Sequence, residues 1–111
     1  MKISGRKERD LFIFEIEGRL DSSNSLDLEE QFDKWIEQGE RKLIGDFSRL
    51  EFLSSAGLRA LIQALKRVTP DGGNLVLCNM RGIVSEIFKI TGLGNAITIV
   101  NDKASAIACF K

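Results

Sequence analysis

The chain has 111 residues, 43% of them hydrophobic and 29% charged, which is typical of one compact domain and unlike a disordered segment. Its 16 basic residues balance 16 acidic ones, which argues against direct nucleic-acid binding, because nucleic-acid-binding surfaces normally carry excess positive charge. The lack of histidine excludes Ser-His and Cys-His nucleophile pairs and histidine metal sites, so we expect neither a metal nor another cofactor.

Targeting signals are not visible in the sequence. The first ten residues, MKISGRKERD, lack the apolar segment of a signal peptide, and no apolar run approaches transmembrane length. Cys78 and Cys109 lie in apolar stretches (LVLCNM and AIACFK), and we expect both to be buried small hydrophobic residues. These features predict a cytoplasmic protein without membrane insertion.

The first third of the chain predicts a hairpin, a loop and a helix. Residues 11–17 (LFIFEIE) alternate as a strand with at least one buried face, and residues 2–6 could pair with it antiparallel. Residues 18–25 (GRLDSSNS) are a loop with several possible helix caps. The following helix places four apolar side chains on one face and ends at Gly39; these are Leu28, Phe32, Trp35 and Ile36, and we expect them in the core.

The remaining two thirds alternate between strands and helices. Short apolar strands are predicted at residues 43–47, 74–79 and 96–100. Asp46 is predicted to cap a neighbouring loop. Amphipathic helices are predicted between these strands, and a last helix follows Asn101 or Asp102 as its cap. The apolar residues assigned to these helices are Leu58, Leu61, Ile62, Leu65 and Val68 in the first, and Ile83, Val84, Ile87, Phe88 and Ile90 in the second.

This order of elements predicts an α/β fold over residues 1–111, read as a single domain. Strand–helix alternation favours parallel strands joined by right-handed crossovers, and the early hairpin adds antiparallel pairing at one side. We therefore expect a mixed sheet of four to five strands with about four helices. In such sheets, functional groups gather where the carboxyl ends of strands meet the following helix starts.

Two adjacent serines, Ser54 and Ser55, stand at one of these helix starts. In one interpretation, a serine hydroxyl only caps the helix by accepting a hydrogen bond from an amide of the first turn. In the other, one serine is an accessible site for a phosphate, which the partial positive charge of a helix start tolerates. The second interpretation suits a binding switch, since a phosphate adds about two negative charges without unfolding the domain.

Four stretches together resemble the STAS domain family, specifically its small bacterial anti-sigma factor antagonists. They are EGRLDSSNS, KLIGDFSRLEFLSSAGLRALI, GGNLVLCNMRGIVSEIFKITGL and ITIVNDKASAIA, and they span nearly the whole chain. The resemblance implies a STAS-like fold. It also implies that the phosphorylated serine of the family falls on Ser55, two residues before Gly57, although Ser54 occupies a position where relatives often have aspartate.

The resemblance further implies a partner-binding surface around this serine. The loop aspartate of the family matches Asp21, with Ser22 beside it, and that loop is expected to border Ser55. Arg59 and Gln63 lie on the outward face of the following helix, where they are either partner contacts or ordinary solvated residues. The complete set implied for partner binding is Asp21, Ser22, Ser54, Ala56, Gly57, Arg59 and Gln63.

In the family that the chain resembles, the unphosphorylated antagonist binds an anti-sigma factor that is a serine kinase of GHKL type, and a sigma factor is released. Phosphorylation by that kinase breaks the complex, and a PP2C-type phosphatase restores it. The resemblance thus implies a non-enzymatic regulator. Two alternatives remain open: an unphosphorylated STAS scaffold or subunit of a transport or lipid-trafficking complex, and a hydrolase using Ser54 or Ser55 with a spatially close lysine.

Overall fold

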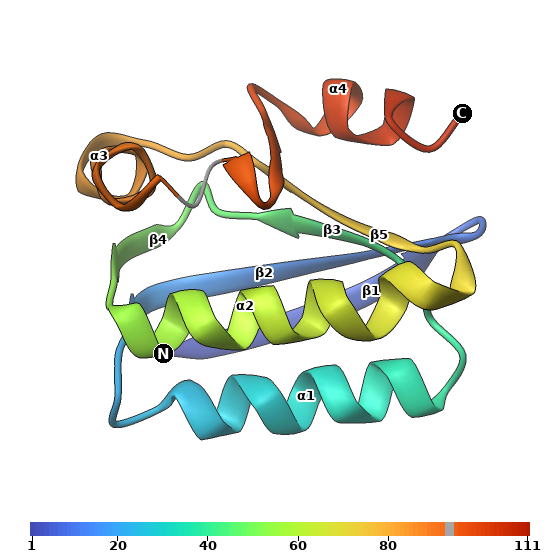
Figure 1. Cartoon of the computed structure of the whole chain (residues 1–111), viewed down its shortest axis with the longest axis horizontal. Helices are drawn as coiled ribbons and strands as arrows, with labels where there is room; N and C mark the ends of the chain where they lie inside the picture. Colours follow the sequence, from blue (N-terminus) through green and yellow to red (C-terminus); the bar gives the residue numbers. More distant parts are fainter. Residues whose placement is uncertain (93–94) are drawn as a thin grey trace.

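The computed structural model describes residues 1–92 and 95–111, and its strands and helices alternate along the chain as Figure 1 shows. Leu93, the last residue of the third stretch quoted above, lies outside the described residues. The strands are β1 (Lys2–Glu8), β2 (Leu11–Leu20), β3 (Lys42–Asp46), β4 (Leu50–Leu53), β5 (Asn74–Cys78) and β6 (Thr98–Val100). The helices are α1 (Ser25–Glu37), α2 (Ser55–Val68), α3 (Gly82–Thr91) and α4 (Lys103–Ala108), and a 3₁₀ turn (Thr69–Asp71) follows α2.

The strands form one mixed sheet in the order β1-β2-β3-β5-β6. β1 and β2 pair antiparallel, whereas β2, β3, β5 and β6 run parallel to one another. This confirms the predicted α/β fold with an amino-terminal hairpin. Within the described ranges the sheet has six strands, because β4 is a separate strand that pairs in parallel with the end of β2.

β4 exists because the chain turns directly after β3. Asp46 accepts a hydrogen bond from the Ser48 amide at 3.0 Å, and the Leu50 amide donates to the Phe47 carbonyl at 3.1 Å. The prediction that Asp46 caps a neighbouring loop is therefore confirmed. After this turn the chain leaves β3, and β4 pairs with the end of β2. Ser54 and Ser55, which follow β4, therefore lie at that end of the sheet.

The core has two parts, one on each face of the sheet. Helices α1 and α2 cover one face and α4 covers the other (Figure 1). β2 contributes to both parts, since Phe14 and Ile16 face the α1/α2 side whereas Ile13 faces the α4 side. The predicted burial of Phe32 and Trp35 is confirmed, and both rings pack against Phe14 with centroid separations of 5.2 and 5.5 Å.

Helix α3 departs from the prediction. Val84 and Phe88 are buried, but Ile83 and Ile90 expose 55% and 81% of their surface. α3 packs against the short strand β4 at one end of the sheet instead of lying across a sheet face. A helix that packs against so narrow an element buries only part of its apolar face. The apolar face predicted from the sequence is therefore wider than the face that is buried.

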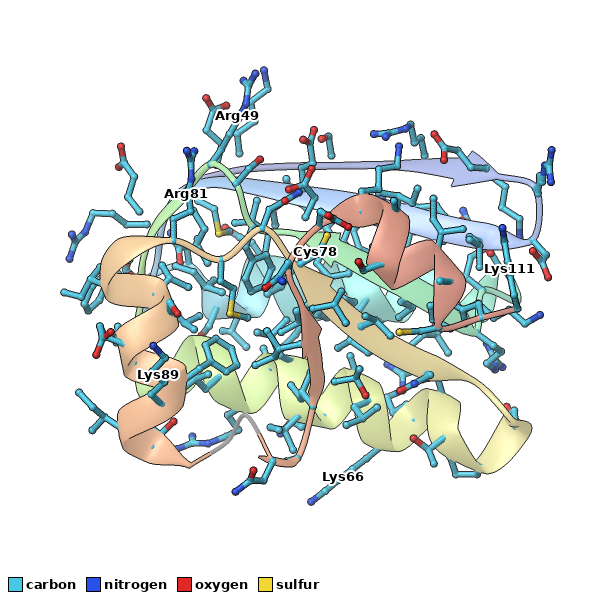
Figure 2. All side chains as sticks on the ribbon, turned by 90° about the horizontal axis from the view of Figure 1, so that it is seen from above. Arg49, Lys66, Cys78, Arg81, Lys89 and Lys111 are labelled. Carbon is cyan, nitrogen blue, oxygen red and sulfur yellow. The ribbon has the colours of Figure 1, made fainter. Side chains whose placement is uncertain are left out.

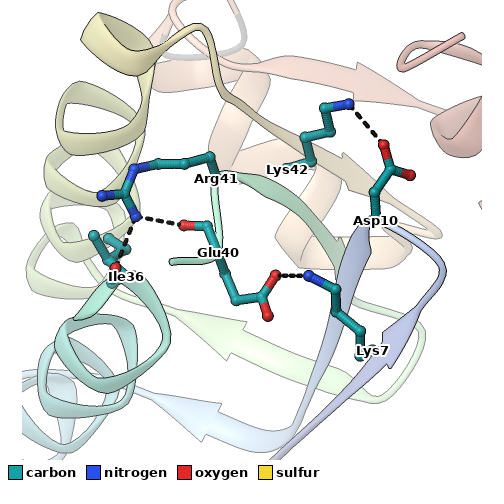
Figure 3. A network of polar contacts seen from close by, with 6 residues as sticks. All are labelled: Lys7, Asp10, Ile36, Glu40, Arg41 and Lys42. Carbon is teal, nitrogen blue, oxygen red and sulfur yellow. Dashed lines mark hydrogen bonds and ion pairs between the residues drawn. The ribbon is translucent and has the colours of Figure 1, made fainter. Parts of the chain in front are cut away.

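Polar contacts close the end of the domain that carries the β1–β2 turn (Figure 3). Lys7 pairs with Glu40 at 2.5 Å and Lys42 pairs with Asp10 at 2.7 Å. Arg41 donates to the carbonyls of Ile36 and Glu40 at 2.7 and 3.0 Å, which ties the segment after α1 to the end of that helix. This end of the molecule is thus held by local structural contacts, opposite the end where the serines lie.

The two cysteines differ in environment. Cys78 is fully buried in the cluster beneath α4, as predicted, and burial raises the pKa of its thiol to about 11. Cys109 is exposed near the end of the chain, so the prediction that it is buried is wrong. Cys109 directly follows the short helix α4, in which Ala106 is buried and Ala108 is exposed. The apolar stretch AIACFK is therefore not buried as a whole.

This difference predicts the reactivity of the two thiols. In the native protein at pH 8, an aromatic disulfide reagent should titrate one thiol rapidly, and a second only after denaturant is added, because only the thiolate reacts and burial keeps Cys78 protonated. Cys109→Ser should abolish the rapid reaction, whereas Cys78→Ser should leave it intact. Rapid reaction of two thiols per native chain would contradict the buried position of Cys78.

Candidate functional site

The start of α2 meets the end of β2 at one end of the sheet (left in Figure 1). The Ser54 amide donates to the Leu20 carbonyl at 2.9 Å, which joins the segment after β4 to the segment after β2. The loop that begins at Asp21 therefore borders the start of α2, as the resemblance implied. Together with the β2–β4 pairing, this hydrogen bond brings together residues more than thirty positions apart in sequence.

Helix α2 begins at Ser55 because Ser54 is extended, with φ −93° and ψ 174°, and its carbonyl accepts the first helical hydrogen bond from Leu58 at 3.0 Å. Gly57 allows this first turn to lie close against the sheet. A Cβ atom at Gly57 would fall 2.7 Å from Leu20 Cγ and 2.7 Å from Leu53 Cδ1. The close approach fixes the direction in which the first amides of α2 point.

The two serines have opposite surroundings. Ser55 is exposed. The Ser54 hydroxyl oxygen has less than 1 Å² of accessible surface, and no hydrogen-bond partner is found for it among the described residues. Ser54 stands at the N-cap position but makes no side-chain cap hydrogen bond to α2 in the described structure, so the interpretation in which a serine hydroxyl caps the helix is not met at Ser54. The reason is its side-chain orientation, since its backbone has the extended conformation of a cap residue.

The adjacent loop is ordered by Asp21 and Asn24. The Asp21 carboxylate accepts hydrogen bonds from the Ser23 hydroxyl at 2.5 Å and the Ser23 amide at 2.9 Å, which lower its pKa below the ordinary value. Asn24 accepts from the Asp21 amide and donates to the Arg19 carbonyl, both at 2.9 Å. The loop therefore presents a charged carboxylate at neutral pH beside the start of α2.

A further pair at this end was not found from the sequence. Arg19 and Phe52 are partners in the β2–β4 register, and the Arg19 guanidinium carbon lies 4.3 Å from the centre of the Phe52 ring. Arg19 is exposed and Phe52 is half-buried. Because no strand was predicted over residues 50–53, the cross-strand register that forms this cation–π contact could not be predicted.

The structure brings the predicted partner-binding residues to the start and outer side of α2 and to the loop before α1. Ser22, Arg59 and Gln63 are exposed, and Asp21, Ser54 and Ala56 are half-buried. Gly57 is buried against Leu20 and Leu53, which points to a role in packing. Gln63 lines a shallow groove between α1 and α2, together with Glu29 and Arg67.

Other polar groups lie at the carboxyl ends of β3 and β5. Asn79, whose φ is +61°, donates to Asp46 at 3.0 Å, and Arg81 donates to the Ser48 carbonyl at 2.7 Å. Partial burial acts to raise the pKa of Asp46, but the hydrogen bonds from Asn79 and Ser48 outweigh it and lower that pKa. Arg49 and Arg81 lie close together at this edge in Figure 2. The hydrogen bonds of Asp46, Asn79 and Arg81 hold the turn before β4 in place.

Within residues 1–92 and 95–111, no three cysteine or acidic side chains gather closely enough to hold a metal ion. The helices of the same ranges are all too short or too polar to cross a membrane. The features that remain are an exposed serine at a helix start, an ordered acidic loop beside it and a stacked arginine. They define a small α/β domain whose distinguishing site is a surface around one helix start.

Comparison with known proteins agrees with this description. The chain belongs to the STAS domain family, whose sequence pattern matches residues 2–106. It is 33% identical over its whole length to BtrV of Bordetella bronchiseptica, and the match covers 96% of that protein. BtrV is named as a candidate anti-sigma factor antagonist.

Solved structures show the same fold. A candidate anti-sigma factor antagonist from Thermotoga maritima is 20% identical with a TM-score of 0.89, and the match covers 96% of this chain and 92% of the other. The phosphorylated form of SpoIIAA from Bacillus is 20% identical with a TM-score of 0.73, and the match covers 99% and 100%.

The contact of Gly57 with Leu20 and Leu53 gives a prediction for stability. Gly57→Ala should lower the free energy of unfolding by about 1–3 kcal/mol, because the new methyl group must displace two core leucines. Urea unfolding monitored by Trp35 fluorescence measures this change. Ser55→Ala, two residues away and exposed, is the control and should change the free energy by less than about 0.5 kcal/mol. Equal stability of Gly57→Ala and the parent protein would contradict the close packing.

Proposed function

We propose that this protein is an anti-sigma factor antagonist whose unphosphorylated form binds an anti-sigma factor through the start of α2 and is released by phosphorylation of Ser55. The observation that carries the proposal is the exposed Ser55 hydroxyl on the first residue of α2, on a chain one third identical to a candidate antagonist. SpoIIAA, which shares the fold, has been solved in both unphosphorylated and phosphorylated forms.

Accessibility favours Ser55 over Ser54 as the modified serine. A kinase must bring the hydroxyl oxygen to the γ-phosphate of ATP, and this requires a solvent-accessible oxygen. Ser55 meets the requirement, whereas the Ser54 hydroxyl has less than 1 Å² of accessible surface. We therefore assign phosphorylation to Ser55 and a supporting position to Ser54. We take the kinase to be the GHKL-type anti-sigma factor itself and the opposing enzyme to be a PP2C-type phosphatase.

The switch follows from desolvation and charge. In the unphosphorylated state Ser55 offers a small neutral group that a partner can cover at little cost. A phosphate adds about two negative charges, which must be stripped of water when the partner binds. It also adds them beside Asp21, whose lowered pKa keeps it ionised at neutral pH. Each 1.4 kcal/mol lost reduces affinity tenfold, so a few kcal/mol is enough to dissociate a micromolar complex.

The proposed binding surface combines both sides of the helix start. Asp21 and Ser22 contribute the loop before α1, and Ser54, Ala56, Arg59 and Gln63 contribute the start and outer side of α2. Gly57 acts indirectly, by allowing the first turn to pack against Leu20 and Leu53. Arg19, stacked on Phe52, adds an exposed cation beside this surface. The protein itself acts as a ligand and as a kinase substrate, and not as an enzyme.

Phosphorylation can be tested by incubating the protein with a candidate GHKL-type anti-sigma kinase of the same organism and ATP, with intact-mass detection. We expect one added phosphate on the parent protein and on Ser54→Ala, and none on Ser55→Ala. Circular dichroism of Ser55→Ala must show a native fold for its lack of phosphate to count. A phosphate that persists on Ser55→Ala would contradict the assignment.

The switch itself can be tested by charge substitution. Ser55→Glu should weaken binding of the anti-sigma factor at least tenfold in isothermal titration while the thermal midpoint stays within about 2 °C, because Ser55 is exposed and a negative charge is favourable at a helix start. Ser55→Gln is the control of similar size without charge and should bind more tightly than Ser55→Glu. Equal losses of binding for the two variants would show that bulk, and not charge, breaks the complex.

A further inference from the structure

The Ser54 hydroxyl is the one buried side-chain oxygen or nitrogen of the described residues for which no hydrogen-bond partner is found. A buried hydroxyl without a hydrogen-bond partner is less stable than a paired one, because it has lost its bonds to water. An alanine at this position would avoid this loss, and an aspartate would cap the helix. The unmodified protein therefore shows no hydrogen bond that would account for a serine at this position.

The backbone of Ser54 is held on both sides while its side chain is free of polar contacts. Its amide donates to Leu20 at 2.9 Å, and its carbonyl accepts from Leu58 at 3.0 Å. Rotation about χ1 can therefore move the hydroxyl without disturbing the sheet or the helix. The extended backbone of Ser54, with ψ 174°, is the conformation from which a serine side chain reaches over the first amides of a helix.

We propose that the Ser54 hydroxyl is a positioning group for the phosphorylated state, in which it rotates over the first turn of α2 and donates a hydrogen bond to the phosphate on Ser55. The proposal rests on the phosphorylation of Ser55 put forward above. Consecutive Cα atoms are about 3.8 Å apart, so a phosphate on residue 55 lies within reach of a hydroxyl on residue 54.

Serine suits this role because a hydroxyl can donate and accept at the same time. In the rotated position it accepts from an open amide of the first turn of α2 and donates its proton to the phosphate. Aspartate in its place could accept from the amide but, when ionised, could not donate, and its charge would repel the phosphate. Serine at position 54 thus stabilises the modified state without adding charge to the unmodified surface.

The proposal is tested without a kinase, by genetic incorporation of phosphoserine at position 55 in the full chain. Thermal midpoints are measured for the parent, Ser54→Ala and Ser54→Asp, each with serine or phosphoserine at position 55. Ser54→Ala should leave the unmodified midpoint unchanged or slightly raised, and should lower the phosphorylated midpoint by about 3 °C, because only the phosphorylated state uses the hydroxyl. Ser54→Asp should raise the unmodified midpoint and lower the phosphorylated one.

The ionisation of the phosphate gives an independent readout. The second pKa of phosphoserine 55, followed by phosphorus NMR, should rise by roughly 0.5 unit in Ser54→Ala, because a donor favours the dianion, and further in Ser54→Asp. Ser25→Ala, at the first residue of α1, is the matched control and should leave the phosphate pKa unchanged.

Equal midpoint changes of Ser54→Ala in the two modification states, together with an unchanged phosphate pKa, would overturn the proposal. Because the phosphate is installed during synthesis, this result is independent of the kinase assay, whose failure would contradict the proposed function instead.

Discussion

The hydrogen bond from the Ser54 amide to the Leu20 carbonyl is the constraint on which the site depends. It joins the ends of β4 and β2, and with them the start of α2 and the loop of Asp21. Gly57 completes the junction, since any side chain there would collide with Leu20 and Leu53. Both leucines belong to the main core, so the position of the surface serine is set by the packing of the sheet against its helices.

A consequence of this arrangement is that the helix start has polar groups that the fold itself does not use. The first amides of an α-helix have no partner within the helix. Ser54, which could cap them, keeps its hydroxyl buried and unpaired in the described structure. Unsatisfied groups and local strain concentrate at functional sites, where they are maintained by the surrounding structure. The rigid junction beneath α2 is that surrounding structure here.

Most of the fold could be predicted from the sequence because its signals are strong and local. The alternation of Phe12, Phe14 and Ile16 predicted a buried strand, and the helical spacing of Leu28, Phe32 and Trp35 predicted a buried helix face; both are confirmed. Asp102 caps α4 through a hydrogen bond of 2.8 Å from Ser105, one of the two predicted caps.

Features that depend on tertiary packing were missed. β4 has four residues, too few to show a period, and its separation from β3 arises from the Asp46 turn. Ile83 and Ile90 are exposed because of where α3 packs. The spacing of apolar residues indicates which face of the helix is apolar, but not which element covers that face. The Arg19–Phe52 contact depends on the β2–β4 register in the same way. The side-chain orientation of Ser54 could not be predicted either, because the sequence indicates a cap but not the rotamer.

In the proposed switch, a modification of one residue would act through charge, because the backbone of this helix start is held by hydrogen bonds and close packing. A phosphate on Ser55 changes the charge of a surface whose backbone is fixed by Leu20, Leu53 and Leu58. The added charge would then change the affinity for the partner and would not be offset by a movement of the chain. A flexible site could turn a phosphate away from the interface. A rigid site would keep the phosphate at the interface. In the proposed switch, the difference in affinity between the unphosphorylated and phosphorylated forms therefore depends on how firmly the junction between β2 and α2 is held.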